Sequence, residues 1–522
     1  MNIQKVEQQT VVFNDAFAKK ANSLIPTIYK ERIRPKQIVE IVEDSKVIHG
    51  WRTEQVREVS DLQEIEFGKG DSVIVDFGDH EVGYVTLKLK SAGSPPDAPL
   101  HVKLTFGEMP VEVAEPFSSY DGWLSSSWLQ EESVYVDVLP HILALTRRYS
   151  FRYVKIDIID TSPKYRVIID DTYCDAVSSA QLSDVYSYTH EDSVLAEIDQ
   201  VSIKTLKDCM QEIFEDGPKR DRRLWLGDLR LQALANYNTF ATNDLVKRCL
   251  YLFAAVPNDK GQVAANVFIQ PSLIADDTYL YDYSLFFTTT LHDYYEETKD
   301  EETLKELWPT AYRQLELGLA RLDERHIVQD DETWWSFIDW NDKLNKQAPS
   351  QAVLIYALRK GIALAQIVGA CELAFLEKQL ADVEKATKAH LWDETKQFFV
   401  SGKNKQVSWA AQVWMVLAGV LKQDEGRALM ERVITEKPPV TMNTPYMYHH
   451  FVEALLKVGM NTEAIKTLKA YWGGMLEDGA DTFWELYNPN DKTFSPYGSH
   501  LINSYCHAWS CTPTYLIRKY EL

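Results

Sequence analysis

Closely spaced cysteine pairs are missing from this sequence of 522 residues. Its six cysteines are scattered, and the nearest two, Cys506 and Cys511, have four residues between them. A zinc site normally uses pairs such as Cys-x-x-Cys, and a disulfide framework is typical of small secreted chains. We therefore expect reduced, mostly buried thiols rather than a disulfide framework or a zinc site.

Positive charge and long apolar runs are also scarce. Lysine and arginine together number 55 against 77 acidic residues, which gives a formal net charge of -22. Phosphate binding needs a basic surface, so nucleic acids and anionic membranes are excluded as expected partners. No apolar run approaches the roughly 20 residues that span a bilayer. The first ten residues lack the basic and apolar regions of a secretory signal, so we expect a cytoplasmic protein.

What is present divides the chain in two. Before about residue 180, apolar and polar residues alternate in runs at 72–78, 83–90, 101–107 and 153–158. A period of two, with Gly, Pro and Asp between the runs, predicts antiparallel strands with one solvated face. Residues 1–185 are therefore expected to form a β-sandwich domain with an N-terminal extension, in which residues 14–23 could form a short helix.

After about residue 190 the apolar residues recur at helical spacing. Twelve helices are the number needed for six antiparallel hairpins closed into an (α/α)6 barrel, so residues 186–522 are expected to form that barrel. The expected helices span 194–214, 228–240, 243–256, 280–298, 301–322, 350–373, 376–390, 407–421, 424–435, 445–458, 461–475 and 500–518.

The most informative segment is 216–228, which places three carboxylates and four cations around a Gly-Pro pair and Trp225. The carboxylates belong to Asp216, Asp221 and Asp228. Mixed charge beside an aromatic ring suits a sugar, and paired carboxylates can provide the acid and the base for cleaving its glycosidic bond. Two plainer readings stay open: Asp228 could cap a helix beginning at residue 229, and the whole segment could be a charged interdomain loop.

Two later segments have the same mixture of acids and rings, and a third places a histidine beside a ring. Glu485 follows Trp484, and aromatic neighbours raise the pKa of a carboxyl group by removing water from it. Residues 334–342 place Asp339 among tryptophans that could form either a ligand wall or a domain contact. His507 lies near Trp509 in a stretch expected to be helical, where a histidine is more often a core residue than a catalyst.

Together these segments resemble the bacterial α-L-rhamnosidases of glycoside hydrolase family 78. Segment 216–228, Asp-Gly-Pro-Lys-Arg-Asp-Arg-Arg-Leu-Trp-Leu-Gly-Asp, is similar to the family's Asp-Cys-Pro-Gln-Arg-Asp-Glu-Arg-Leu-Gly-Trp-Thr-Gly-Asp. Thr482-Phe-Trp-Glu485 resembles its Thr-x-Trp-Glu, and Ile338-Asp-Trp340 resembles its Gly-Asp-Trp. The strand phrases at 75–85 and 104–108 resemble its β-domain. The resemblance covers about residues 60 to 520.

The resemblance implies hydrolysis of terminal α-L-rhamnosides with inversion, without a metal or cofactor. Asp221 would be the general acid and Glu485 the general base, with their carboxylates about 6.5–9.5 Å apart. Sugar hydroxyls would be held by polar side chains, and tryptophans would line the site. The remaining expected substrate-binding residues are Asp216, Arg220, Trp225, Asp228, Trp335, Asp339, Trp340, Trp484 and His507.

One position departs from the family. Its catalytic acid is a Glu directly after an Arg-Asp pair, and a gapless comparison from Asp216 puts Arg222 there. Arginine cannot donate a proton at neutral pH. Counting back seven residues from Asp228 instead gives Asp221, with Asp216 as the alternative acid. A six-hairpin glycosidase for another sugar and an inactive carbohydrate-binding homologue therefore stay open, as do the aglycone and a homo-oligomeric state.

Overall fold

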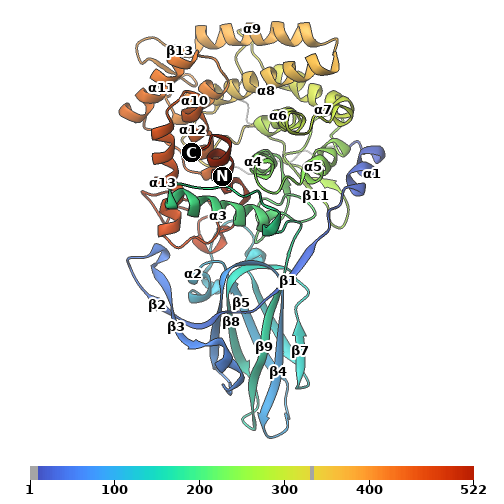
Figure 1. Cartoon of the computed structure of the whole chain (residues 1–522), viewed down its shortest axis with the longest axis vertical. Helices are drawn as coiled ribbons and strands as arrows, with labels where there is room; N and C mark the ends of the chain where they lie inside the picture. The colour runs from blue at the N-terminus through green and yellow to red at the C-terminus, as the bar shows by residue number, and fades with distance from the viewer. Residues whose placement is uncertain (1–9, 330–333) are drawn as a thin grey trace.

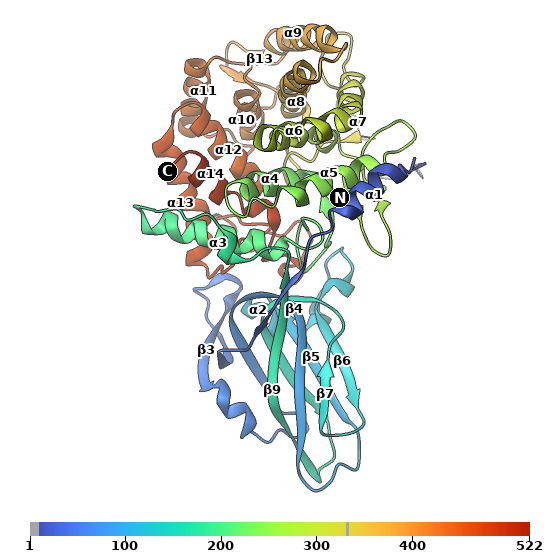
Figure 2. The same cartoon turned by 45° about the vertical axis from the view of Figure 1, so that its right-hand side comes forward.

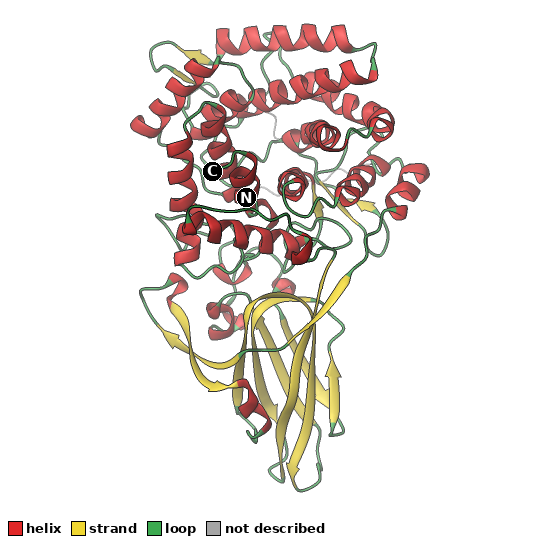
Figure 3. Ribbon diagram, in the orientation of Figure 1, coloured by secondary structure: helices red, strands yellow, loops and turns green. Residues whose placement is uncertain are grey.

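The computed structural model describes residues 10–329 and 334–522. The long strands gather at one end of the molecule and the long helices at the other, with short strands among the helices, as Figure 1 and the colouring by secondary structure in Figure 3 show. The two parts stay separate when the molecule is turned by 45° (Figure 2). The expected class, an antiparallel β-domain followed by a helical barrel, is confirmed. The prediction of no signal sequence concerns residues that lie, except for Thr10, outside the described part.

The β-domain is organised around one long bent strand, β4 (Ser72–Gly93). Its first part pairs with β2 and β8 and its second part with β7 and β9, all antiparallel. The register shifts between Asp76 and Glu81, so the two strands expected at 72–78 and 83–90 are one interrupted strand. The other strands are β1 (Tyr29–Ile33), β2 (Gln37–Glu43), β3 (Trp51–Glu58), β5 (Leu100–Gly107), β6 (Glu131–Val136), β7 (His141–Ala144), β8 (Tyr149–Asp160) and β9 (Tyr165–Ser178).

The helical domain is a double ring. Within the described residues, six helices contact one another in sequence around a closed inner ring, and each follows an outer helix along the chain. The inner helices are α4 (Leu226–Tyr237), α6 (Tyr281–Thr298), α8 (Gln347–Val368), α10 (Trp409–Leu417), α12 (Pro445–Lys457) and α14 (Pro513–Lys519). The outer helices are α3 (Ser193–Cys209), α5 (Asn243–Ala255), α7 (Glu301–Leu319), α9 (Leu373–His390), α11 (Gln423–Glu436) and α13 (Asn461–Glu477). Six hairpins therefore form the barrel.

Burial separates the two rings. Every residue of inner helix α4 is buried, whereas outer helix α9 buries only four of its residues along one stripe. Helix α4 is therefore surrounded by protein although it carries polar residues such as Asp228 and Arg230, whereas an amphipathic helix such as α9 covers a core with one face. Helix α8 has the length and composition of a membrane span. In this fold it packs against α6, α7, α9 and α10 as part of the barrel.

The N-terminal helix is confirmed as α1 (Asp15–Ser23), and it lies against the barrel. Asn14 caps it by accepting hydrogen bonds from two backbone amides, and Arg248 of α5 donates to the Ala21 carbonyl. The prediction of unpaired thiols also holds: the six cysteines are free, and Cys371 is the exposed one.

The prediction of one helix over residues 500–518 is wrong. The chain forms two 3-10 turns, η7 (His500–Ile502) and η8 (Ala508–Ser510), before α14 begins with Pro513 in its first turn. Backbone groups here bond to distant segments: the Tyr505 amide donates to Glu108 and the Ala508 amide to the Asp216 carbonyl. His507 consequently precedes η8 in extended backbone, outside any helix.

Candidate active site

The loop between α3 and α4, residues 210–225, lies at the end of the barrel that meets the β-domain. It is closed at its base because the amide of Asp216 donates to the Arg223 carbonyl, and the Arg223 amide donates to Asp216 Oδ1 at 3.0 Å. At its tip, Asp221 and Arg222 both adopt left-handed backbone, with φ of 64° and 53°. For residues other than glycine this costs about 1–2 kcal/mol each, a kind of strain that concentrates at functional sites.

This turn sends neighbouring side chains to different places. Asp221 Oδ1 lies 3.8 Å from an Arg220 nitrogen, on the side of the buried carboxylates. Arg222 Nη2 donates instead to the Arg148 carbonyl of the β-domain at 2.8 Å. Arg222 therefore contacts the β-domain, whereas the Asp221 carboxylate faces the buried carboxylates of the site.

Glu485 occupies the centre of the cluster and is buried. Its two carboxylate oxygens have different partners: Tyr497 donates to Oε1, and Arg220 and the Ser504 amide donate to Oε2. Burial alone would raise the pKa of Glu485, but the Arg220 guanidinium, His507 and the Tyr497 hydrogen bond bring that pKa below its ordinary value. Glu485 is therefore a carboxylate at neutral pH.

Two other buried acids near Glu485, Asp216 and Asp228, show the opposite shift in pKa. Burial and the neighbouring charges of Asp221 and Asp228 raise the pKa of Asp216 well above its ordinary value. Burial also raises the pKa of Asp228, although His507 Nε2, 3.3 Å from Asp228 Oδ1, opposes the rise. A protonated carboxyl group can donate a hydrogen bond, which a carboxylate cannot. The site thus combines the ionised Glu485 with two buried carboxyl groups whose pKa values are raised.

Asp228 does not cap the following helix, so that alternative is wrong. Helix α4 begins at Leu226 with Trp225 at the capping position, and Asp228 lies inside its first turn. An acid in the first turn still interacts favourably with the helix dipole. A close approach between segments explains Gly227, where a Cβ atom would lie 2.4 Å from the Tyr283 ring.

Gly217 brings the two halves of the site together in the same way. A Cβ atom at this position would lie 3.0 Å from Ser504 Oγ and 3.2 Å from His507 Nδ1. The loop of Asp216 and the segment 504–507 therefore pack directly on each other. Six of the expected residues form this polar cluster: Asp216, Arg220, Asp221, Asp228, Glu485 and His507.

Aromatic rings form a continuous wall beside the cluster. Trp225 contacts Tyr283 edge-on, Tyr283 contacts Phe337, and Phe337 lies 5.4 Å from Trp340. Trp340 continues to Tyr497 at 6.0 Å. Within residues 10–329 and 334–522, the buried Nε1 atoms of Trp225 and Trp340 have no hydrogen-bond partner in the protein. Both atoms have almost no accessible surface, so the rings and not these nitrogens form the wall.

Three expected residues lie apart from this cluster. Trp484 is buried between Tyr487 and Tyr505, where it packs the core. Asp339 accepts hydrogen bonds from the Asn443 amide and the Thr444 hydroxyl, and burial raises its pKa to about 6. It thereby fixes the start of α12. Trp335 has Lys346 Nζ 4.8 Å from its ring centre.

Sequence reasoning missed Tyr497 and Lys219 as members of the site. Tyr497 lies in the long loop 478–499 and bonds to Glu485 only because that loop folds back. Lys219 is buried and donates to Glu112 of the β-domain and to the carbonyls of Leu501 and Asn503. A lysine next to Arg220 within the charged loop was the available signal, but its partner lies 107 residues away.

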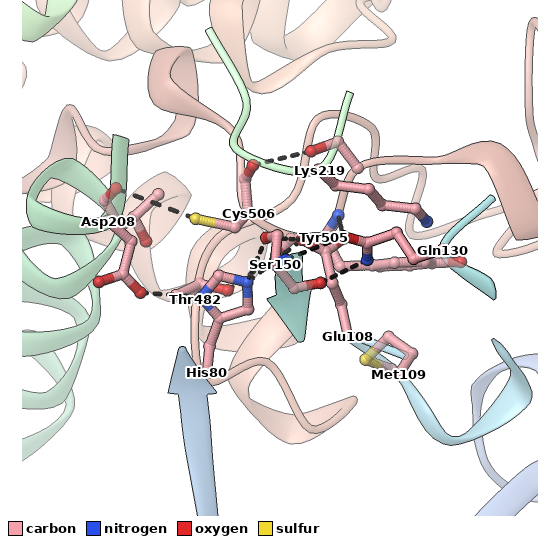
Figure 4. A network of polar contacts seen from close by, with 12 residues as sticks. His80, Glu108, Met109, Gln130, Ser150, Asp208, Lys219, Thr482, Tyr505 and Cys506 are labelled. Carbon is pink, nitrogen blue, oxygen red and sulfur yellow. Dashed lines mark hydrogen bonds and ion pairs between the residues drawn. The ribbon is translucent and has the colours of Figure 1, made fainter. Parts of the chain in front are cut away.

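A buried polar network supports this site from the β-domain side (Figure 4). His80, in the interrupted part of β4, contacts Asp208 at 2.8 Å and Glu108 at 3.2 Å. Burial would lower the pKa of His80, but hydrogen bonds to these two carboxylates raise it well above its ordinary value. Glu108 in turn accepts from the Tyr505 amide at 2.7 Å. The network therefore links the β-domain to the segment carrying His507.

The same network includes a group with metal-ligand atoms. Among the described residues, ligand atoms of His80, Asp208 and Cys506 lie within 4.8 Å of one another. However, Lys204 Nζ lies 2.6 Å from Asp208 Oδ2, and the imidazolium of His80 already supplies positive charge. These residues fit an ion-pair network rather than a metal ion.

Comparison with known proteins agrees with this geometry. Residues 35–176 match the family model of the glycosyl hydrolase family 78 alpha-rhamnosidase N-terminal domain, and residues 184–520 match that of the bacterial alpha-L-rhamnosidase 6 hairpin glycosidase domain. The solved rhamnosidase from Klebsiella oxytoca with rhamnose bound is 50% identical, with a TM-score of 0.97 over 98% of this chain and 100% of that one.

Two more distant structures share the fold. The family 78 rhamnosidase of Bacillus sp. GL1 is 22% identical with a TM-score of 0.74, over 89% of this chain and 49% of that one. The α-L-rhamnosidase from Dictyoglumus thermophilum is 16% identical with a TM-score of 0.68, over 94% and 52%. A search of curated proteins finds no match.

Proposed function

The chain belongs to glycoside hydrolase family 78 and is a glycosidase acting on rhamnosides, and on that premise we propose an inverting mechanism with Asp221 as general acid and Glu485 as general base. In this mechanism Glu485 removes a proton from water, whose oxygen attacks the anomeric carbon. Asp221 donates a proton to the glycosidic oxygen as its bond to the anomeric carbon breaks. The first sugar released is then β-L-rhamnose.

The observation that carries the base assignment is the ion pair between Arg220 and Glu485. The guanidinium and the Tyr497 hydroxyl stabilise the ionised form of Glu485, which is the form a general base needs. Both side chains of the pair are at most 5% exposed, so their attraction is little screened by solvent.

The acid assignment rests on position. Asp221 has 23% of its side chain exposed, whereas Asp216 and Asp228 are almost fully buried. A general acid must reach the glycosidic oxygen, which lies toward the leaving group at the mouth of the site. Asp216 is also bonded to the Arg223 amide, which suits a residue holding a sugar hydroxyl. Asp216 as the acid is the alternative.

The rest of the sugar site follows from the same contacts. Asp216, Asp228, Arg220 and His507 would hold hydroxyl groups, and the rings of Trp225 and Trp340 would line the sugar. The inactive homologue considered from the sequence depended on Arg222 replacing the acid, and Arg222 contacts Arg148 instead. A cytoplasmic location stays a prediction, which fractionation of the host cell tests.

Leaving-group dependence tests the acid. Asp221→Asn should lower kcat progressively more as the leaving group of an aryl α-L-rhamnoside becomes poorer. The loss should reach about 10²–10⁴-fold for the poorest leaving group, because only a poor leaving group needs the proton. Glu485→Gln should lose activity on all of them. If Asp216→Asn shows the graded loss and Asp221→Asn does not, Asp216 is the acid. Proton NMR during the first turnovers checks inversion, which early α-L-rhamnose would refute.

A further inference from the structure

A loop of the β-domain reaches the mouth of the active site. It runs between the short turns η3 (Phe117–Ser119) and η4 (Ser126–Trp128). The amide of Trp123 donates to the Tyr497 carbonyl at 3.2 Å, and its indole Nε1 donates to the Pro496 carbonyl at 2.9 Å. The two loops also pass close together, because a Cβ atom added at Gly498 would lie 3.6 Å from the Cα atom of Gly122. Trp123 is therefore fixed to the barrel loop by both its backbone and its side chain.

Despite these two anchors, Trp123 is 46% exposed. Its one side-chain polar atom is already hydrogen-bonded, so the surface left to solvent is the carbon face and edge of the indole. A large ring held in one orientation with an exposed face loses little conformational entropy when another ring stacks on it. Trp123 thus has the properties of a preorganised stacking surface.

The location of this surface connects it to catalysis. The ring centre of Trp123 lies 5.8 Å from that of Tyr497. Tyr497 donates to Glu485 and has the Arg220 guanidinium 4.5 Å from its ring. One ring, that of Tyr497, therefore lies between the exposed indole and the proposed base.

We propose that Trp123 forms a binding subsite for the leaving group of the rhamnoside, and that this leaving group presents a flat ring, either an aromatic aglycone or a pyranose. The proposal rests on the proposed function, because it assumes that rhamnose occupies the polar cluster around Glu485. The subsite binds by ring stacking and contact with apolar C–H groups, so it selects for a ring and not for a charge.

Kinetics with three substrates test this subsite. They are methyl α-L-rhamnoside, the aryl glycoside 4-nitrophenyl α-L-rhamnoside, and a disaccharide in which α-L-rhamnose is linked to β-glucose. Trp123→Ala should raise KM about tenfold for the aryl glycoside, the disaccharide or both. It should leave methyl α-L-rhamnoside and the inhibition constant of free L-rhamnose within about twofold. Trp123→Phe, which keeps a ring, should recover part of the loss. Tyr135→Ala, at a 69% exposed ring on the β-domain, is the control.

The pattern of loss separates the outcomes. Loss on the aryl substrate alone identifies an aromatic aglycone, and loss on the disaccharide alone identifies a pyranose. Equal loss on methyl rhamnoside and weaker inhibition by L-rhamnose would overturn the proposal, because Trp123 would then act by supporting Tyr497. Unchanged kinetics on both ring-bearing substrates would overturn it too. A wild-type enzyme that releases α-L-rhamnose first would instead refute the inverting mechanism and leave the subsite test intact.

Discussion

The guanidinium of Arg220 donates a hydrogen bond to Glu485 Oε2, although 265 residues separate the two in the sequence. The residue before Arg220, Lys219, donates to Glu112 of the β-domain. Two adjacent cations of one loop thus neutralise one buried carboxylate from each domain. The base assignment and the stability of the interdomain contact both depend on this loop.

The first prediction concerns the acid side of the pH profile. Because the pKa of Glu485 is lowered below 4.5, its ionised form persists as the pH falls to that value and is lost only below it. We expect log(kcat/KM) to have no Glu485-linked decline between neutral pH and about pH 5. Initial rates on 4-nitrophenyl α-L-rhamnoside, at pH values where the circular dichroism is unchanged, measure this. A decline centred above pH 5 that Glu485→Asp shifts would contradict it.

Removing the Arg220 guanidinium should move the acid limb of the pH profile. Arg220→Met leaves Glu485 buried without its main counter-charge, so the pKa of Glu485 should rise and the acid limb should move up by about 1–3 pH units. Arg220→Lys keeps the charge and should move the limb less, although it loses the planar donor geometry. The same rate measurements decide. An acid limb that does not move in Arg220→Met would mean that Arg220 does not set the ionisation of Glu485.

The buried ion pair between Lys219 and Glu112 should matter for stability. Both side chains are fully buried, and removing one partner of such a pair typically costs about 3–5 kcal/mol. Lys219→Met should therefore lower the thermal unfolding midpoint clearly, and adding Glu112→Gln, which still accepts from the Glu108 and Met109 amides, should recover part of the loss. The exposed pair Arg427–Glu431 on α11 is the control, where Arg427→Met should cost at most about 1 kcal/mol. Equal shifts in both variants would contradict this account.

Glu108 should act as a positioning residue. It accepts from the Tyr505 amide and so fixes the segment that carries Ser504 and His507. Glu108→Gln removes the charge and loosens that segment, and kcat should fall by up to about 10²-fold with a smaller change in KM. Glu132→Gln, whose side chain contacts Tyr149 elsewhere in the β-domain, is the control. If the unfolding midpoint falls and kcat of the folded enzyme does not, Glu108 has only a structural role.

Arg222 should be dispensable for chemistry. Its side chain donates to the Arg148 carbonyl, and burial together with the nearby charge of Arg148 lowers its pKa to about 10. Arg222→Ala should keep kcat within about twofold of wild type on good and poor leaving groups alike. A graded loss like the one expected for Asp221→Asn would place Arg222 in the catalytic machinery.

The sequence predicted the elements whose signal is local. The alternation in β5 and β8 and the helical spacing of α3 to α13 are periodic because each element buries one face or is buried throughout. The loop 216–228 and Glu485 could be singled out because acids beside rings are unusual and because they resemble a family motif. Their mutual contact was not visible in any local pattern.

Long-range hydrogen bonds explain what was missed. The apolar spacing of residues 500–518 suggested a helix, but the amides of Tyr505, His507 and Ala508 bond to Glu108, Phe483 and Asp216. Glu108 and Asp216 lie hundreds of residues away and Phe483 lies outside the stretch, so the local periodicity carries no information about them. Tyr497 bonds to Glu485, 12 residues before it, and that contact depends on how the loop folds back rather than on any periodic pattern.

The left-handed turn at Asp221 and Arg222 has a consequence for altering this enzyme. Successive side chains leave the turn in opposite senses, one toward the barrel and one toward the β-domain. An acid moved from position 221 to position 222 would therefore point toward the β-domain, whether it is Asp or Glu. Restoring the family's Glu at Arg222 would therefore supply a carboxylate that has no access to the sugar. The backbone of this turn therefore decides which domain a side chain at position 221 or 222 reaches.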